Sequence, residues 1–173
     1  MPQIIIQISI TFIVLVSAVY FIWLVIFSIP YWPSDKKFIK NLIDNLRQEK
    51  VFKIAEFGAG DGRVAFELCK NGYKVDAYEI NPIFSIFMRL YKIFMGEKKI
   101  KIYNENFLKS RIDYSQYQAI VLYLNPKLMG ILEQKLFEKM PINSIIISNT
   151  FKFPNKTAEK VIDKMLLYRV KRN

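Results

Sequence analysis

The residues best suited to chemistry lie in one short stretch, AEFGAGDGR at residues 55–63. An apolar run, Val51–Phe57, carries Glu56 near its end, and glycine then occupies every second position, at Gly58, Gly60 and Gly62. Glycine lets backbone approach a ligand closely, and the helix-forming sequence that follows would offer free N–H groups at its start. This order of strand, glycine loop and helix predicts a binding site for a nucleotide-like ligand.

The spacing of the glycines indicates which ligand. A dinucleotide-binding loop has G-x-G-x-x-G, but this chain has Arg63 where the third glycine would stand. The pattern E-x-G-x-G-x-G resembles motif I of the class I, seven-strand S-adenosylmethionine-dependent methyltransferases. The resemblance implies that this segment binds the cofactor, with the acid ordering the loop and the amino-acid end of the ligand. The assigned residues are Glu56, Phe57, Gly58, Ala59, Gly60 and Gly62.

A second carboxylate follows the next expected strand, Lys74–Ile80. In open α/β sheets ligands lie at the carboxyl ends of strands, so Glu79 would reach the site and accept hydrogen bonds from both ribose hydroxyls. The alternative is that Glu79 caps the next helix, but Asn81-Pro82 already supplies a cap and an N1 proline. We therefore assign Glu79 and its neighbour Ile80 to the cofactor.

The expected third strand, 99–103, leads to a further candidate. Methyltransferases of this class often place an acid and an aromatic residue here, beside the adenine amino group. Asn106 and Phe107 match in position, and an asparagine carbonyl can still accept from adenine. Glu105 is the nearest competitor for this role.

The expected fourth strand, 118–124, would end where the methyl acceptor approaches. Nucleic-acid amino-methyltransferases use Asn/Asp-Pro-Pro-aromatic here to stack a flipped base. This chain has Lys127 and Leu128 after a single proline and so lacks the stacking platform, which argues against nucleic acid as the substrate. Tyr123 and Asn125 are the candidates to orient an amine for catalysis.

Five features extend the resemblance over almost the whole chain: the hydrophobic N-terminus, EFGAGDGR, YEINP, YLNP with its following helix, and the run Ser148-Asn149-Thr150-Phe151 before Phe153-Pro154. Together they resemble the small archaeal and mitochondrial-type protein-lysine methyltransferases. This resemblance implies S-adenosylmethionine as cofactor and a lysine side chain of a protein as substrate. A lipid, quinone or other small amphiphile as acceptor, and a cofactor-binding module without turnover, remain alternatives.

The elements that must position these residues alternate along the chain. Helices are expected at 34–49, 64–70, 82–95 and 127–139, and a fifth strand at 144–149; the tail should form a hairpin turning near Asp163-Lys164, or a single strand over 165–171. Strands alternating with helices predict a parallel sheet covered on both faces. The fold class is therefore a Rossmann-like, three-layer α/β sandwich.

The helix at 82–95 is apolar nearly all round. One stripe, Ile83, Ile86, Phe87, Leu90 and Phe94, is expected to serve the core. A second stripe consists of Phe84, Met88, Tyr91 and Met95. It either packs under the loop after the third strand or meets the tethering segment, a membrane or a partner.

Residues Ile4–Ile29 carry no charge, and this run is longer than the ~20 residues needed to cross a bilayer. No basic residue precedes them, which disfavours a cleaved signal peptide. We therefore expect a transmembrane anchor at 1–32, with Tyr31 and Trp32 at the interface, before a methyltransferase domain at 33–173. The lysines that follow, from Lys36, predict a single-pass protein whose domain lies on the cytoplasmic or equivalent interior side.

Composition excludes several classes of chemistry. The 173 residues include no histidine and one cysteine, so Ser-His and Cys-His nucleophile pairs and Cys/His zinc sites are ruled out, and no metal is expected. Cys69 is expected to be a core residue. The net charge of +11 suits an acidic partner, although scattered lysines on a solvated surface would give the same count. The expectation is a membrane-anchored N-methyltransferase of unknown oligomeric state.

Overall fold

The computed structural model describes residues 2–27 and 33–171 and divides the chain into two compact units, 1–32 and 33–173. The first unit holds helix α1, Pro2–Phe27. Within the described residues, no helix combines the length and apolarity needed to cross a membrane, so the expected transmembrane span and single-pass localisation are wrong. The expectation rested on length and lack of charge, but α1 also carries polar Gln7, Ser9 and Thr11. Tyr31 and Trp32 lie outside the described residues.

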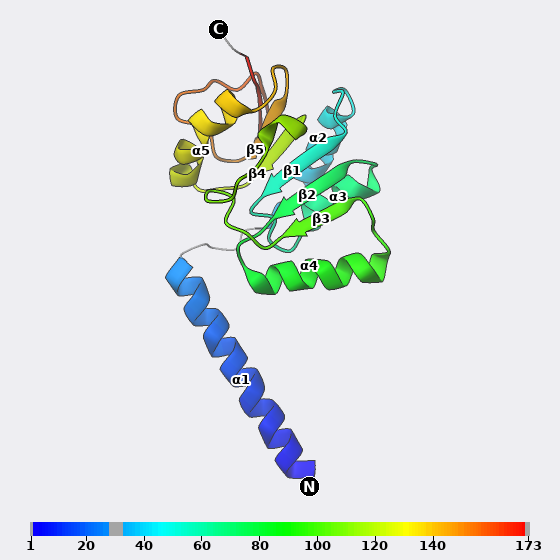
Figure 1. The fold of residues 1–173 in the computed structure, drawn as a ribbon, viewed down its shortest axis with the longest axis vertical. Helices are drawn as coiled ribbons and strands as arrows, with labels where there is room; N and C mark the ends of the chain where they lie inside the picture. Colours follow the sequence, from blue (N-terminus) through cyan, green and yellow to red (C-terminus); the bar gives the residue numbers. More distant parts are fainter. Residues whose placement is uncertain (1, 28–32, 172–173) are drawn as a thin grey trace. The chain divides into compact units, whose positions relative to one another are not determined.

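The second unit is built on one seven-stranded sheet (Figure 1). Its order is β3-β2-β1-β4-β5-β7-β6, with the first five strands parallel and the last two antiparallel to their neighbours. The strands are β1 Lys53–Phe57, β2 Lys74–Tyr78, β3 Ile100–Tyr103, β4 Ala119–Leu122, β5 Ile145–Asn149, β6 Lys160–Ile162 and β7 Met165–Arg169. The chain order reverses between β1 and β4, and ligands bind at such a switch point in open α/β sheets.

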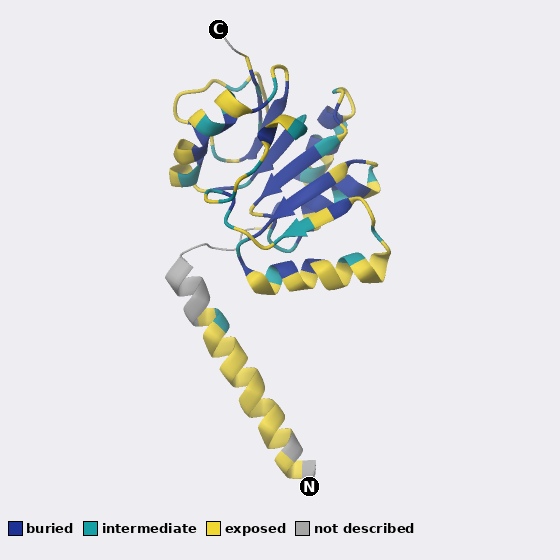
Figure 2. Cartoon of the chain, viewed as in Figure 1, coloured by how far each residue is buried: buried dark blue, intermediate teal, exposed yellow. Residues whose placement is uncertain are grey.

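Helices cover both faces of the sheet. They are α2 Lys36–Leu46, α3 Arg63–Lys70, α4 Pro82–Met95 and α5 Pro126–Lys139, with a 3₁₀ turn, η1, at Tyr114–Gln116. One core packs α2 and α3 against alternate strand residues, and the other packs α5 and η1 against the remainder. The central strands β1, β2, β4 and β5 are buried between these layers (Figure 2), which confirms the expected Rossmann-like fold.

The sequence predicts that helix α2 begins at 34 with Ser34 as its N-terminal cap, and that expectation is wrong. Asp35, not Ser34, caps the helix, because its carboxylate accepts a hydrogen bond from the Phe38 amide at 2.7 Å. Ser34 is buried instead, and its hydroxyl meets the side chain of Asn149. The linker into α2 therefore reaches the carboxyl end of β5.

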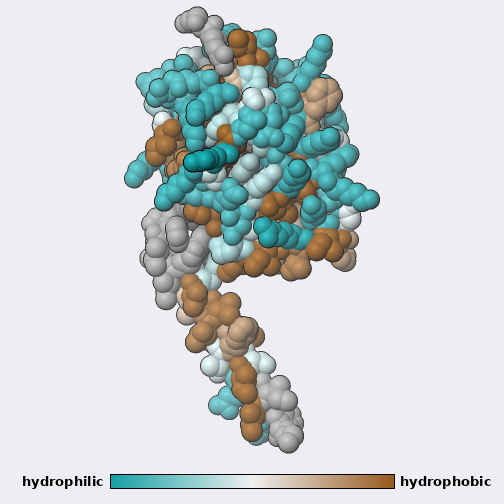
Figure 3. All heavy atoms as spheres, viewed as in Figure 1, coloured by the Kyte–Doolittle hydropathy of each residue, from teal (hydrophilic) through white to brown (hydrophobic). Residues whose placement is uncertain are grey.

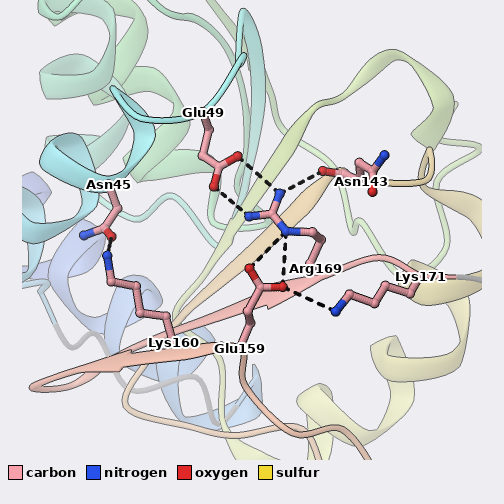
Figure 4. Close-up of polar contacts among 7 residues, drawn as sticks. All are labelled: Asn45, Glu49, Asn143, Glu159, Lys160, Arg169 and Lys171. Atoms are coloured by element: carbon pink, nitrogen blue, oxygen red, sulfur yellow. Dashed lines mark hydrogen bonds and ion pairs between the residues drawn. The ribbon is translucent and has the colours of Figure 1, made fainter.

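The C-terminal hairpin forms as the first of the two expected alternatives, with β6 and β7 turning at Asp163, whose φ is 51°. Figure 4 shows how it is held to the rest of the unit. Arg169 on β7 donates to Glu49, with Nη2–Oε1 at 2.7 Å, and its Nε lies 3.0 Å from Glu159 Oε1. The hydrogen bond from Arg169 holds the pKa of Glu49 below its usual value.

Helix α4 matches its expected range but reverses its expected faces. The stripe expected in the core is exposed: Ile83, Ile86, Phe87, Leu90 and Phe94. Of the second stripe, Met88 is fully buried and Phe84 is half-buried, whereas Tyr91 and Met95 are exposed, although the Tyr91 ring lies edge-on to Phe66 of α3 at 4.7 Å. Ordinary packing therefore accounts for Met88 and for the contact of Tyr91 with Phe66, and the more apolar stripe has no cover among the described residues of this unit.

Candidate cofactor and acceptor site

The glycine loop is held in place by the end of the neighbouring strand. The amides of Gly58 and Ala59 both donate to the Tyr78 carbonyl, at 2.9 and 3.0 Å, and Gly62 N–H donates to the Ala59 carbonyl. Gly58, Gly60 and Gly62 all adopt positive φ, at 77°, 56° and 80°. These three amides thus shape the loop itself, and glycine is needed for its backbone conformation.

Gly62 also lies against the inner face of α4. A Cβ placed there would come 2.7 Å from both Cγ and Sδ of Met88, which is fully buried. The loop, α3 and α4 therefore meet at a contact that has no room for a methyl group. This contact fixes which face of α4 is turned inward.

Glu79 links the loop to the start of α4. Its Oε2 accepts from the Gly60 amide and its Oε1 from the Asn81 amide, both at 2.7 Å. Asn81 caps α4 as expected, by accepting from Ile83 N–H, but this does not leave Glu79 unengaged. Each carboxylate oxygen has a second lone pair, so acceptor capacity for hydroxyls remains. Burial raises the pKa of Glu79, and backbone donors at Asn81, Gly60 and Ile80 oppose that rise.

Glu56 is a buried acid with one oxygen unmatched. Its Oε2 has no hydrogen-bond partner within the described part of the chain, and the residue is only 7% exposed. Burial, followed by the nearby Asp61 carboxylate, raises the pKa of Glu56 well above its usual value. A cationic ligand group would both pair this oxygen and stabilise its charge.

Two asparagines in this region were missed as contributors by sequence reasoning. Asn81 Nδ2 is a buried donor without a partner in the described residues. Asn104 donates from Nδ2 to the carbonyls of Glu79 and Ile80, at 2.9 and 3.1 Å, and so ties the end of β3 to the end of β2. The position of Asn104 directly after the third strand could have indicated its role, because ligand sites lie at the carboxyl ends of such strands.

The two residues assigned to adenine differ in burial, because Phe107 lies in the core and Asn106 lies nearer the surface. Phe107 is buried and its ring stacks on Phe57, with centroids 5.0 Å apart and planes within 3°. Both rings belong to the core on the α5 face. Asn106 is half-buried, and its Oδ1 accepts from the Leu108 amide at 3.0 Å. Phe57 and Phe107 thus contribute packing, whereas Asn106 remains at the surface of the site.

The expected acceptor residues follow β4. Tyr123 is half-buried, and its ring centre lies 6.2 Å from that of Phe151, which follows β5. Asn125 is exposed and caps α5, because its Oδ1 accepts from the Leu128 amide at 3.0 Å. Tyr123 thus lies beside Phe151, whereas the side-chain carbonyl of Asn125 is used to cap α5.

Asn149 closes this edge of the site. It is only 2% exposed; its Nδ2 donates to Ser34 at 3.3 Å, and its Oδ1 accepts from the Thr150 hydroxyl at 3.0 Å. Thr150 itself adopts φ 69°, which is unusual for a β-branched residue. The linker at Ser34, Asn149 and the turn after β5 are therefore locked together beside the acceptor residues.

Comparison with known proteins identifies the family. The profile of the ANTKMT methyltransferase domain matches residues 56–160, from Glu56 to the start of β6. The chain belongs to the ANTKMT methyltransferase domain family. The S-adenosylmethionine-dependent class expected from motif I, and its cofactor, are confirmed by this membership and by the fold.

Curated relatives show what this member of the ANTKMT family resembles. It is 29% identical over 134 residues to a human lysine N-methyltransferase named for a subunit of ATP synthase, covering 77% of this chain and 56% of that protein. It is 24% identical over 127 residues to the mouse adenine nucleotide translocase lysine N-methyltransferase, covering 73% and 55%. The chain thus spans about half the length of these relatives.

A solved structure shows the same fold. An RNA methyltransferase from Salinibacter ruber in complex with S-adenosyl-L-homocysteine matches with a TM-score of 0.75. The match covers 82% of this chain and 95% of that one, at 18% identity. At this identity the similarity establishes the architecture of the ANTKMT-type domain and not its substrate.

The residues of this site fit the cofactor in chemical terms. S-adenosylmethionine carries an ammonium and a sulfonium, and the site holds a buried carboxylate oxygen at Glu56 that lacks a partner among the described residues. The cofactor also carries two ribose hydroxyls, and Glu79 at the carboxyl end of β2 keeps lone pairs for them.

Proposed function

We propose that this domain methylates the side-chain amine of a lysine in a protein substrate. The observation that carries the proposal is the family membership together with its curated relatives, whose names specify lysine as the acceptor in two different target proteins. The two relatives differ in the protein they are named for, so the shared element is the amine. The target protein of this chain is left open.

The proposed donor side consists of the glycine loop with Glu56, Glu79 and Ile80, and Asn106 at the adenine end. S-adenosylmethionine, when bound, supplies a methyl group made electrophilic by the sulfonium. Glu79 would hold the ribose hydroxyls, and the free oxygen of Glu56 would pair with the amino-acid end. Phe57, Gly58, Ala59, Gly60 and Gly62 would contribute backbone and shape, and Phe107 would support Phe57 from the core.

The proposed acceptor side lies at the ends of β4 and β5. A lysine amine has a pKa near ~10.4 and must lose a proton before it can attack a methyl group. Tyr123 and the Asn125 amide would orient the neutral amine, and Asn149 would fix the edge beside them. Catalysis would then depend mainly on placing the amine in line with the transferred methyl and on excluding water.

The fourth-strand motif supports an amine on a flexible side chain over a nucleobase. A flipped base needs a stacking platform, whereas Asn125-Pro126 is followed by Lys127, which is exposed, and Leu128. The paired rings of Tyr123 and Phe151 instead suit a cation or its neutral amine. This favours a protein lysine.

The proposal is tested by following the methyl group. The full chain is incubated with methyl-labelled S-adenosylmethionine and a cell extract, and the products are separated into protein, nucleic acid and organic-soluble fractions. Label in protein that is recovered as Nε-methyllysine after hydrolysis supports the proposal, with Glu79→Gln as the low-binding control. Label in the organic-soluble or nucleic-acid fraction, with none in lysine, contradicts it.

A further inference from the structure

The outer face of α4, defined as Ile83, Ile86, Phe87, Leu90, Ile93 and Phe94, is the most exposed apolar surface of the methyltransferase unit (Figure 3). The exposed fraction of these side chains is 42% at Ile83 and is highest near the end of the helix, at 76% for Ile93 and 85% for Phe94. The spacing i, i+3, i+4, i+7 places these side chains on one side of the helix. In Figure 3 hydrophobic atoms gather where Figure 1 places α4.

This exposure is a consequence of the fold. The buried side of α4 consists of Ser85 and Met88, with Tyr91 packed on Phe66, and it is fixed by the contact with Gly62. The helix cannot rotate to hide its outer face without losing that contact. A surface of six large apolar side chains is more than isolated exposed residues and marks an interaction site.

Charge around the helix indicates the partner. The 14 residues of α4 include Arg89 and Lys92 and no acid, and residues 82–101 contain five basic residues and one acidic residue. The one acid, Glu97, is engaged with the Lys99 amide at 2.7 Å. Every charged residue of the chain lies beyond residue 34, so the net charge of +11 belongs to the methyltransferase unit.

We propose that the outer face of α4 lies on an anionic lipid surface. A helix with a wide apolar face, flanked by basic side chains and presented at the protein surface, is the arrangement that binds in the interfacial plane of a bilayer. The contact is peripheral, because the inner side of α4 stays packed on the unit; it makes no use of α1. The helix, ~21 Å long at 1.5 Å per residue, would lie along the surface.

The same charges disfavour a second copy of the chain as the occupant. In an antiparallel pairing of two α4 helices, Arg89 lies near the midpoint and would approach its symmetry mate. No acidic residue on α4 offers compensation. An anionic lipid headgroup satisfies Arg89 without a specific partner residue.

A single thiol probe localises the contact in the full chain. Cys69 is the only cysteine; it is 1% exposed, and burial raises the pKa of its thiol to about 12, so it will not compete for labelling at neutral pH. Phe87→Cys places a polarity-sensitive fluorophore on the outer face of α4. Ile131→Cys, on α5 and 52% exposed, is the matched control on the opposite face of the sheet.

We expect phosphatidylcholine vesicles containing phosphatidylglycerol to shift the emission of the probe at 87 towards that of an apolar environment, and to leave the probe at 131 unchanged. Leu90→Ser with Phe94→Ser should weaken vesicle affinity by about tenfold or more, whereas Ile131→Ser should not. Equal responses at 87 and 131, no response at 87, or a shift at 87 that needs only more protein, as self-association would give, each overturn the proposal. The assay contains no methyl donor, so its outcome is independent of the proposed lysine methylation.

Discussion

The donor and acceptor sides of the proposed site are built in different ways. On the donor side the polar groups interlock: Glu79 accepts from Gly60 and Asn81, and Asn104 fastens β3 to β2. On the acceptor side Asn125 is exposed and caps a helix, and Tyr123 is held only by ring contacts among the described residues. A site that binds one invariant cofactor can be rigid in detail, whereas the acceptor edge leaves room for a large substrate.

Gly62→Ala tests the tightest point of the donor side. The backbone φ of 80° and the 2.7 Å approach to Met88 both oppose a Cβ, so the loop must shift. We expect affinity for S-adenosylhomocysteine to fall by about 100-fold or more, measured by calorimetry. Gly96→Ala is the matched control, because Gly96 also has positive φ but has nothing within 4 Å. Equal losses in both variants would contradict the steric argument.

Glu79→Gln removes the acceptor that joins the loop to α4. The amide nitrogen cannot accept from either Gly60 or Asn81, and one backbone donor is left unpaired at a buried position. We expect cofactor affinity to weaken by about 30- to 100-fold, a loss of about 2–3 kcal/mol. Thermal unfolding measured alongside separates this from collapse of the unit. Unchanged affinity in a folded variant would show that Glu79 only shapes the loop.

Glu56 predicts a pH dependence of cofactor binding. Burial and Asp61 raise the pKa of Glu56 above its ordinary value of 4.5, and a cationic ligand group favours its ionised form. Affinity should therefore increase as pH rises towards the pKa of Glu56 in the free protein, and then level. Calorimetry across pH checks this, and Glu56→Gln should remove the slope.

The raised pKa of Glu56 also makes the free energy of unfolding depend on pH, but stability falls with rising pH whereas cofactor affinity increases. A carboxyl whose pKa is raised by folding supports stability below its unfolded pKa, and that support is lost as pH rises through the folded pKa. The free protein should thus lose stability with rising pH in this window, and Glu56→Gln should lose less. A wild-type profile that matches the variant in both binding and unfolding would refute the role of Glu56.

Tyr123→Phe and Asn125→Ala probe the looser side. Because several groups share the placement of the amine, each change should lower kcat by less than about tenfold. Cofactor affinity should stay the same in both. A complete loss of methyl transfer with Tyr123→Phe would mean that the Tyr123 hydroxyl alone accepts the proton of the amine. The acceptor side would then depend on a single residue as strongly as the donor side does.

Arg169→Met gives the smallest effect on the site. The change breaks the contacts to Glu49, which precedes the start of β1, and to Glu159 (Figure 4), whereas the donor residues lie at the carboxyl ends of β1 and β2. We expect a loss of about 1–2 kcal/mol in the free energy of unfolding, measured with denaturant, and no change in cofactor affinity. Reduced cofactor affinity would show that the hairpin is coupled to the donor side of the site. The donor side would then not be self-contained.

Local patterns predicted most of this fold. The glycine loop, the Asn81-Pro82 start of α4 and the alternation of strands and helices each depend on a few neighbouring residues, and each is found where expected. The sheet order then follows from the fold class that these patterns indicate. The hairpin at Asp163 was one of two alternatives, because β6 and β7 are stabilised by pairing with β5 and not by their own sequence.

The features that local patterns missed are contacts between distant segments. Apolarity alone placed Phe87 and Phe94 in the core, but the contacts with Gly62 and Phe66 turn Met88 inward and bring Tyr91 against α3. The stacking of Phe107 on Phe57 joins residues 50 positions apart in the chain. Likewise, Glu79 was expected to be left for ligand alone, but the loop folds back to it through Gly60.

The most direct test of the donor site is a crystal structure of the full chain with S-adenosylhomocysteine. The account predicts ribose hydroxyls on Glu79, the ligand ammonium paired with Oε2 of Glu56, and a glycine loop that keeps its bonds to Tyr78. A ligand bound away from the carboxyl ends of β1 and β2, or one that leaves both carboxylates untouched, would contradict it.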